Sequence, residues 1–153
     1  AWIMNVATVL NIPILATTED VSAGVDMLPR LKALLPQGQS VFNKMVFSLY
    51  GQKDIRDALE VLKRKDLVLV GQETAVCIAQ SAIDLVNAGY RVWVADDATA
   101  SPGPHHEAGL RRMRSAGVTV SGIKGIYYEW LRDVPTAIAV ETAVNKTPSD
   151  LTL

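Results

Sequence analysis

The chain contains 153 residues, carries a net charge of -1 and is 49% apolar. This length and composition support one substantial hydrophobic core, so we predict a single domain over residues 1–153 and exclude a disordered chain. Lys and Arg are scattered rather than clustered, which disfavours nucleic acid as a partner. No stretch reaches the roughly 20 apolar residues of a membrane helix, so we predict no membrane partner.

The sequence contains one cysteine, Cys77, which cannot form a disulfide within the chain. The first residues show no basic segment followed by an apolar one, the pattern of a secretory signal. Both observations predict a protein of the reducing cytoplasm.

The first predicted elements are a helix and two short strands. Apolar residues recur with helical spacing over residues 3–10, although no Ser, Thr, Asp or Asn precedes them as a cap. The apolar run Ile12–Thr17 predicts a strand, because its proline stands only at the entry. Residues 18–40 are rich in Gly and Pro and predict a loop region, after which Ser40–Phe42 predicts a brief strand.

The middle of the chain alternates helices and strands. Asp54 is predicted to cap a helix that ends in the basic run Lys63–Lys65. Leu67–Val70 is continuously apolar, which predicts a central strand buried on both faces. A helix from about Thr74 to Ala88 follows, and then a strand at Arg91–Ala95.

The same alternation continues towards the C-terminus. We predict a helix over residues 105–116, a strand at Val118–Ser121, and a helix through Tyr127–Trp130 whose aromatic side chains belong to the core or to a subunit interface. The stretch from Val134 predicts an arm or a short helix. The repeated alternation predicts an α/β fold with a doubly wound, mainly parallel sheet, in which ligands bind at the carboxyl ends of the strands.

Cys77 lies near the start of the helix that follows the strand Leu67–Val70. The N–H groups and partial positive charge of a helix N-terminus stabilise a thiolate and suit a nucleophile. The alternative interpretation is that Cys77 is a small buried apolar residue. Position alone does not separate the two.

Lys44 lies in the apolar segment Phe42–Ser48. A partly buried ammonium near Cys77 would stabilise the thiolate further. The alternative is a surface lysine whose aliphatic stem packs on the protein. Phe47, close to Lys44 in the chain, is a candidate substrate contact or a core aromatic residue.

The segment Leu69–Ile78, with its pattern Gly-x-x-Thr-x-x-Cys, resembles the nucleophile segment of the isochorismatase-like cysteine hydrolases. That family includes nicotinamidases, carbamoylsarcosine hydrolase and ureidoacrylate hydrolase. Lys44 with Phe47 and Ser48 resembles the lysine segment of the family. The similarity continues through Ala82–Leu85, Gly89–Val92, Asp96–Ser101 and Met113–Val118. It implies the three-layer, isochorismatase-like fold with a Rossmann-like strand order.

The resemblance implies a catalytic Asp, Lys and Cys, and Lys44 and Cys77 match two of them. In the implied reaction the Cys77 thiolate attacks a carbonyl carbon, while the Asp moves protons. The implied oxyanion donors are the main-chain N–H groups of Glu73 and Cys77. The peptide bond from Gln72 to Glu73 is the implied non-proline cis bond.

The acidic member of the implied triad has no match in this sequence. The family places that Asp at the end of a first strand, which would precede the helix with which this sequence opens. Asp20 and Asp26 follow a later strand and do not match. We therefore expect an N-terminally incomplete isochorismatase-like domain, with further residues upstream in the working protein.

The metal ligands of nicotinamidases, an Asp-x-His and a further His after the second strand, have no match in Thr17–Val21. His105 and His106 are adjacent at the entry to a helix, which is more typical of residues that cap or solvate a turn than of zinc ligands. We predict no metal and no cofactor.

The sequence and the resemblance together predict a cysteine hydrolase that cleaves a carbon–nitrogen bond of a small amide or ureide through a thioester. The expected assembly is a homodimer or homotetramer. The alternative is a non-catalytic relative that serves binding or assembly. A nucleotide-binding domain is disfavoured, because no Gly-x-Gly-x-x-Gly occurs in the chain.

Overall fold

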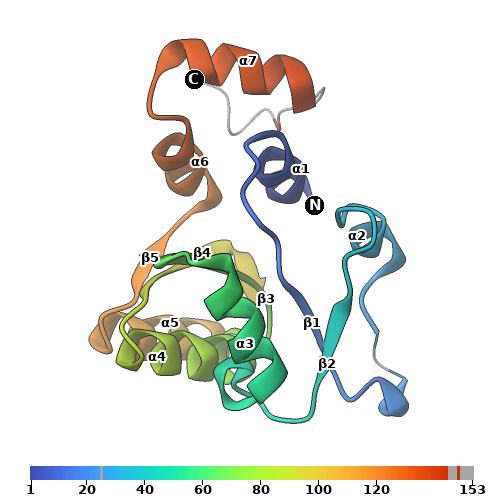
Figure 1. Ribbon diagram of the computed structural model, residues 1–153. Coiled ribbons are helices and arrows are strands. Elements are labelled where there is room, and N and C mark those ends of the chain that lie inside the picture. Colours follow the sequence, from blue (N-terminus) through green and yellow to red (C-terminus); the bar gives the residue numbers. More distant parts are fainter. Residues whose placement is uncertain (25, 145–147, 149–153) are drawn as a thin grey trace. The chain divides into compact units, whose positions relative to one another are not determined.

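The computed structural model describes residues 1–24, 26–144 and 148. Contacts between residues group the chain into two compact units, and each is described by itself. The first unit comprises Ala1–Phe42 together with the segment from Lys124 onwards, and the second comprises Asn43–Ile123 (Figure 1). The polar tail beyond Val144, apart from Pro148, lies outside the described residues.

The second unit contains a three-stranded sheet in the order β3-β4-β5. Its strands are β3 (Asp66–Gln72), β4 (Arg91–Ala100) and β5 (Thr119–Ser121). Both neighbouring pairs are parallel, and a helix lies between each strand and the next in the chain. Parallel neighbours require such crossover connections. The predicted α/β class with a mainly parallel sheet is therefore confirmed.

Helices α4 (Ala79–Asn87) and α5 (His105–Ser115) lie side by side and pack against the sheet (Figure 1). Both are amphipathic, and their fully buried side chains include Leu85, Leu110 and Met113. Helix α3 (Lys53–Leu62) buries Ile55 and Leu59 in the same way. The core of this unit therefore consists of the apolar stripes of three helices and the strands of the sheet.

The prediction that Leu67–Val70 forms a central strand buried on both faces is wrong about the place of the strand in the sheet and about its burial. The strand exists as part of β3, but β4 occupies the middle of the three-stranded sheet and β3 lies at its edge. The side chains of Leu67–Leu69 are half-buried, and Val70 is 41% exposed. A continuous apolar run indicates a strand, but it carries no information on the order of strands, which tertiary pairing decides.

Among the predicted element boundaries, those of the first strand and of the helix after Asp54 also differ from the structure. The predicted strand Ile12–Thr17 is observed as β1 (Ala16–Glu19), which pairs with β2 (Val41–Lys44). Hydrophobicity placed it too early, because a strand forms only where a partner strand lies beside it. Gln52 rather than Asp54 occupies the N-cap position of helix α3, without a capping hydrogen bond from its side chain. Asp54 accepts a hydrogen bond from the Ile55 N–H (2.9 Å) within the first turn.

In the first unit, α1 (Trp2–Val9) packs against α7 (Val134–Val144). The ring of Trp2 meets Tyr127 of α6 (Ile123–Leu131) edge-on at 4.8 Å. Tyr127 is fully buried, as expected for a core aromatic residue. The stretch from Val134 is thus an 11-residue helix, longer than the predicted arm or short helix.

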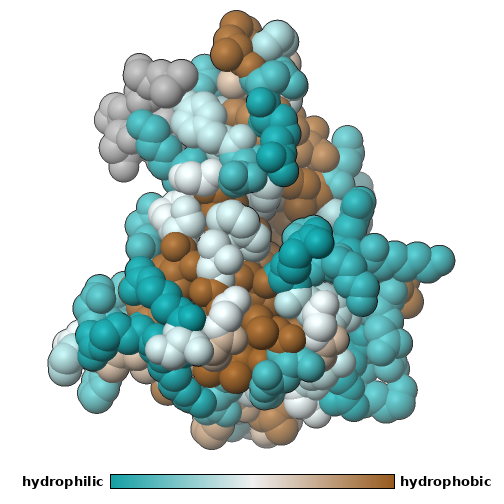
Figure 2. Space-filling view, turned by 90° about the vertical axis from the view of Figure 1, so that its left-hand side faces the viewer, coloured by the Kyte–Doolittle hydropathy of each residue, from teal (hydrophilic) through white to brown (hydrophobic). Residues whose placement is uncertain are grey.

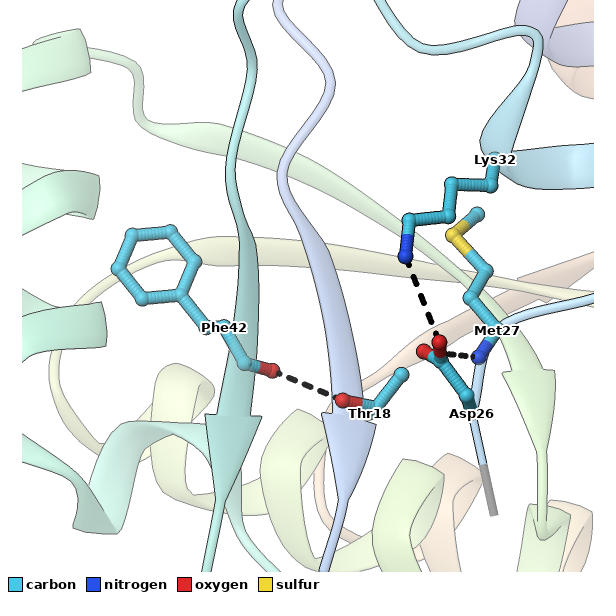
Figure 3. A network of polar contacts seen from close by, with 5 residues as sticks. All are labelled: Thr18, Asp26, Met27, Lys32 and Phe42. Carbon is cyan, nitrogen blue, oxygen red and sulfur yellow. Dashed lines mark hydrogen bonds and ion pairs between the residues drawn. The ribbon is translucent and has the colours of Figure 1, made fainter. Parts of the chain in front are cut away.

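The connection between β1 and β2 in the first unit includes the short helix α2 (Pro29–Lys32). Figure 3 shows Thr18 of β1 donating to the carbonyl of Phe42 at 3.5 Å, and Asp26 accepting from the Met27 N–H at 2.6 Å. The backbone hydrogen bond from Met27, with a smaller effect of Lys32, lowers the pKa of Asp26 below its ordinary value. Asp26 therefore has a local structural role in this loop.

Apolar side chains also reach the surface of the molecule. On the face drawn in Figure 2, they gather in brown areas bordered by hydrophilic residues. In the second unit, three consecutive residues after Lys44 are well exposed: Met45 (66%), Val46 (41%) and Phe47 (54%). Scattered exposure of single apolar residues is ordinary, whereas three in succession distinguish this loop.

Gly109 lies where α5 packs tightly against the chain after β3. A Cβ atom on Gly109 would lie 2.9 Å from the Ala75 Cα. We expect Gly109→Ala to lower the free energy of unfolding by about 1–3 kcal/mol, because the crowding outweighs the better helix propensity of Ala. Ala108→Gly, at an exposed position of the same helix, is the control and should cost about 1 kcal/mol. Urea unfolding measures both, and a more stable Gly109→Ala protein would contradict the close packing.

Candidate functional site

Lys44 is the last residue of β2 and is only 5% exposed. Its Nζ donates to the carbonyl of Val46 at 3.2 Å and lies 3.5 Å from the Sγ of Cys77. The fold thus brings together two residues that stand 33 positions apart in the chain. A buried ammonium needs nearby electron-rich partners. Of the two neighbours of Nζ, a Cys77 thiolate would be a stronger partner than the Val46 carbonyl, because it carries a negative charge.

Cys77 lies in the turn η3 (Thr74–Ile78), which directly follows β3 at the carboxyl end of the sheet. The carbonyl of Glu73 accepts from the Ile78 N–H at 3.1 Å, an i to i+5 bond typical of a π-helical turn. Regular helix begins only at Ala79, so the predicted helix Thr74–Ala88 is divided into η3 and α4. The side chain of Cys77 is half-buried.

The peptide bond from Gln72 to Glu73 is cis, which confirms what the resemblance implied. Glu73 and Cys77, whose N–H groups are the predicted oxyanion donors, stand at the start and in the body of the same turn. The N–H of Ala75 between them donates to the Oγ of Ser101 at 3.0 Å. The role of Glu73 and Cys77 as oxyanion donors stays a prediction.

The loop after Lys44 is held by two polar side chains. The amide of Gln52 accepts from the Met45 N–H (3.0 Å) and donates to the Asn43 carbonyl (3.1 Å), so it bonds to the backbone on both sides of Lys44. The Oγ of Ser81 on α4 accepts from the Leu49 N–H at 3.0 Å. These contacts restrict the position of the backbone at Lys44, from which its side chain extends.

The turn that carries Cys77 has its own supports. The buried Thr74 shares a hydrogen bond of 2.9 Å between its Oγ1 and the Nδ1 of His106, and Ser101 binds Ala75 as described. Sequence reasoning did not find these supports or those of the Lys44 loop. Single Ser, Gln and His residues form no pattern in a sequence, and only their distances from the site distinguish these four.

Phe47, the predicted substrate contact, is 54% exposed. The interpretation of Phe47 as a core aromatic residue is therefore wrong. Its contact with a substrate stays a prediction, supported by its position three residues after Lys44 in the same loop.

Within the described part of the chain, no group of three or more His, Cys, Asp and Glu side chains is arranged to hold a metal ion. None of the helices in the described ranges is both long and apolar enough to cross a membrane.

Residues 7–124 match the Isochorismatase domain. Isochorismatase family protein 2A of Dictyostelium discoideum is 31% identical over 137 residues, which cover 85% of this chain and 68% of that protein. The secreted isochorismatase effector Isc1 of Phytophthora sojae is 28% identical over 142 residues, covering 85% of this chain and 64% of that protein. This chain belongs to the isochorismatase family, a family of hydrolases. It spans 68% of the length of that Dictyostelium protein and 53% of the length of isochorismatase family protein 2B from the same organism.

Among solved structures, the MAR1 ribonuclease of Caenorhabditis elegans superposes with a TM-score of 0.85 at 26% identity. The superposition covers 99% of this chain and 79% of the other. The predicted isochorismatase-like, three-layer fold class is confirmed by this likeness together with the parallel strands and flanking helices.

The contact between Lys44 and Cys77 predicts an acidic thiol. We expect the alkylation of Cys77 by iodoacetamide to reach half of its maximal rate well below pH 8.5, about the ordinary value for a thiol, because the ammonium stabilises the thiolate. Lys44→Met removes the charge and keeps most of the stem, so the midpoint should rise towards that ordinary value. Lys53→Met, at an exposed lysine of α3, is the control and should leave the midpoint unchanged. Intact mass against time at each pH measures the rate, and equal midpoints for wild type and Lys44→Met would contradict the pairing.

Proposed function

We propose that this protein is a cysteine hydrolase that cleaves a carbon–nitrogen bond of a small amide or ureide through a covalent thioester. The observation that carries the proposal is the 3.5 Å contact between the Lys44 Nζ and the Cys77 Sγ, in a chain of the isochorismatase family. A thiolate beside a cation at the carboxyl end of a parallel strand is suited to nucleophilic attack on a carbonyl.

The reaction begins when the Cys77 thiol has lost its proton and the thiolate attacks the carbonyl carbon of the substrate. A carbon–sulfur bond forms, and the π electrons of the carbonyl move to its oxygen. The oxyanion collapses, the carbon–nitrogen bond breaks, and the nitrogen takes up a proton and leaves as ammonia or an amine. Water then attacks the carbonyl carbon bound to sulfur, the carbon–sulfur bond breaks, and the product leaves as a carboxylic acid from an amide or a carbamic acid from a ureide, which restores the thiolate. The resemblance assigns the proton transfers to an Asp that has no match in this sequence.

The oxyanion requires donors that are in place before it forms. We assign this role to the main-chain N–H groups of Glu73 and Cys77, which belong to one short turn. A turn that presents both sulfur and N–H groups can bind the attacked carbon and its oxygen together. Phe47 and its exposed apolar neighbours Met45 and Val46 are suited to contact the rest of a small substrate.

Two other chemistries within reach of this fold are less well supported. Nicotinamide hydrolysis is disfavoured, because Thr17–Val21 lack the metal ligands of the nicotinamidases. The similar structure from Caenorhabditis elegans is a ribonuclease, yet a net charge of -1 offers little attraction to RNA phosphates. A single-stranded RNA nevertheless belongs in the substrate panel, where cleavage would point to that alternative.

The test is a panel of small amides and ureides assayed for release of ammonia or amine. We expect wild-type protein to hydrolyse a member of the panel, Cys77→Ser to lose about a thousandfold or more in kcat/KM, and Lys44→Met to lose at least about a hundredfold. Lys53→Met again serves as the control. Acid quenching followed by intact mass should show the acyl group on wild-type protein and none on Cys77→Ser.

Activity that is equal in wild type and Cys77→Ser would contradict the thioester mechanism. Absence of hydrolysis across the panel, together with an ordinary thiol titration, would favour the non-catalytic relative that serves binding or assembly. Cytoplasmic location and a homodimer or homotetramer are further parts of the proposal, which cell fractionation and light scattering of the purified protein would check.

A further inference from the structure

We propose that His106 is a positioning residue that fixes the turn carrying Cys77 through its hydrogen bond to Thr74. The inference rests on the proposed function, because it assigns His106 a part in keeping the nucleophile in place. His106 does not reach the reacting atoms in this proposal. It acts through Thr74, which stands three residues before Cys77 and is the first residue of η3.

The hydroxyl of Thr74 is fully buried, and its partner is the Nδ1 of His106 at 2.9 Å. A buried hydroxyl without a partner costs free energy, so this bond constrains how the turn leaves β3. Neutral His106 with its proton on Nε2 accepts from Thr74, and the imidazolium donates from Nδ1 to the Thr74 oxygen. The contact is thus available in both charge states of the ring.

Two further contacts hold the same turn to the same stretch of chain. Ser101, just after β4, accepts from the Ala75 N–H at 3.0 Å. Gly109, one turn of α5 after His106, leaves no space for a Cβ atom against Thr74 and Ala75. Residues 101–109 therefore hold the first two residues of η3 through three contacts, and His106 supplies the side-chain bond to Thr74.

The consequence concerns the contact between the Cys77 Sγ and the Lys44 Nζ. Gln52 and the β2 strand position Lys44 through contacts that do not involve Thr74 or His106, so a shift of η3 changes the 3.5 Å separation. If Thr74 is released, η3 gains freedom at its first residue. The Cys77 sulfur then spends less time beside the Lys44 ammonium. The thiolate form is therefore less populated, and its orientation towards a substrate is less well defined.

The experiment measures the second-order rate constant for alkylation of Cys77 by iodoacetamide at pH 7. We expect His106→Ala and Thr74→Val each to lower it by about five- to tenfold, the effect of one hydrogen bond. The double variant should be no slower than either single one, because both remove the same bond. His106→Asn places a side-chain amide near the position of Nδ1 and should stay within about twofold of wild type. His105→Ala, at the exposed neighbouring histidine, is the matched control and should alkylate at the wild-type rate.

A purely structural role would give a different pattern. Alkylation of folded His106→Ala at the wild-type rate would overturn the proposal, whatever the urea midpoint of that variant. Multiplying effects in the double variant, or no rescue by His106→Asn, would overturn it as well. If His106→Ala does not fold, Thr74→Val compared with Thr74→Ser decides, since Ser keeps the hydroxyl. Equal alkylation rates for those two variants would also overturn it.

On any amide that the protein hydrolyses, we expect His106→Ala to lower kcat with little change in KM, because Thr74 and His106 are not placed against the substrate. The alkylation rates are measured without a substrate. A failure of the proposed function and a failure of the His106 inference are therefore told apart.

Discussion

The central physical constraint at the candidate site is the burial of the ammonium group of Lys44. Lys44 is 5% exposed, and its Nζ has the Val46 carbonyl and the Cys77 sulfur within hydrogen-bonding distance. Burying a charge is unfavourable unless partners compensate for the lost water. A thiolate compensates better than a thiol, so the burial of Lys44 favours the thiolate form that we propose for Cys77.

The two members of this pair are held by separate sets of contacts within the second unit. Gln52 bonds to the backbone on both sides of Lys44, and Ser81 binds the loop that follows. The turn with Cys77 is held by residues 101–109, through side chains and through the close approach of Gly109. A separation of 3.5 Å between two side chains on different elements persists only when both backbones are restrained in this way.

The first unit contributes packing and local polar structure. The ring contact between Trp2 and Tyr127 joins α1 to α6, and α7 packs on α1. Asp20 binds Ser22, and Asp26 binds Met27 and Lys32. Neither acid was proposed as the acidic partner of the candidate site, and the structure gives each of them local hydrogen bonds within its own loop.

The sequence by itself determined the α/β class, the helices with strong apolar periodicity, and the family resemblance that named Lys44, Cys77 and the cis bond at Gln72–Glu73. These follow from local patterns, because helical spacing, strand composition and a short segment around a nucleophile are all read from neighbouring residues. Tertiary structure decided that β3 lies at the edge of its sheet, that Lys44 meets Cys77, and that His106 binds Thr74. Strand order and contacts between residues about 30 positions apart depend on how elements pack, which no local pattern encodes.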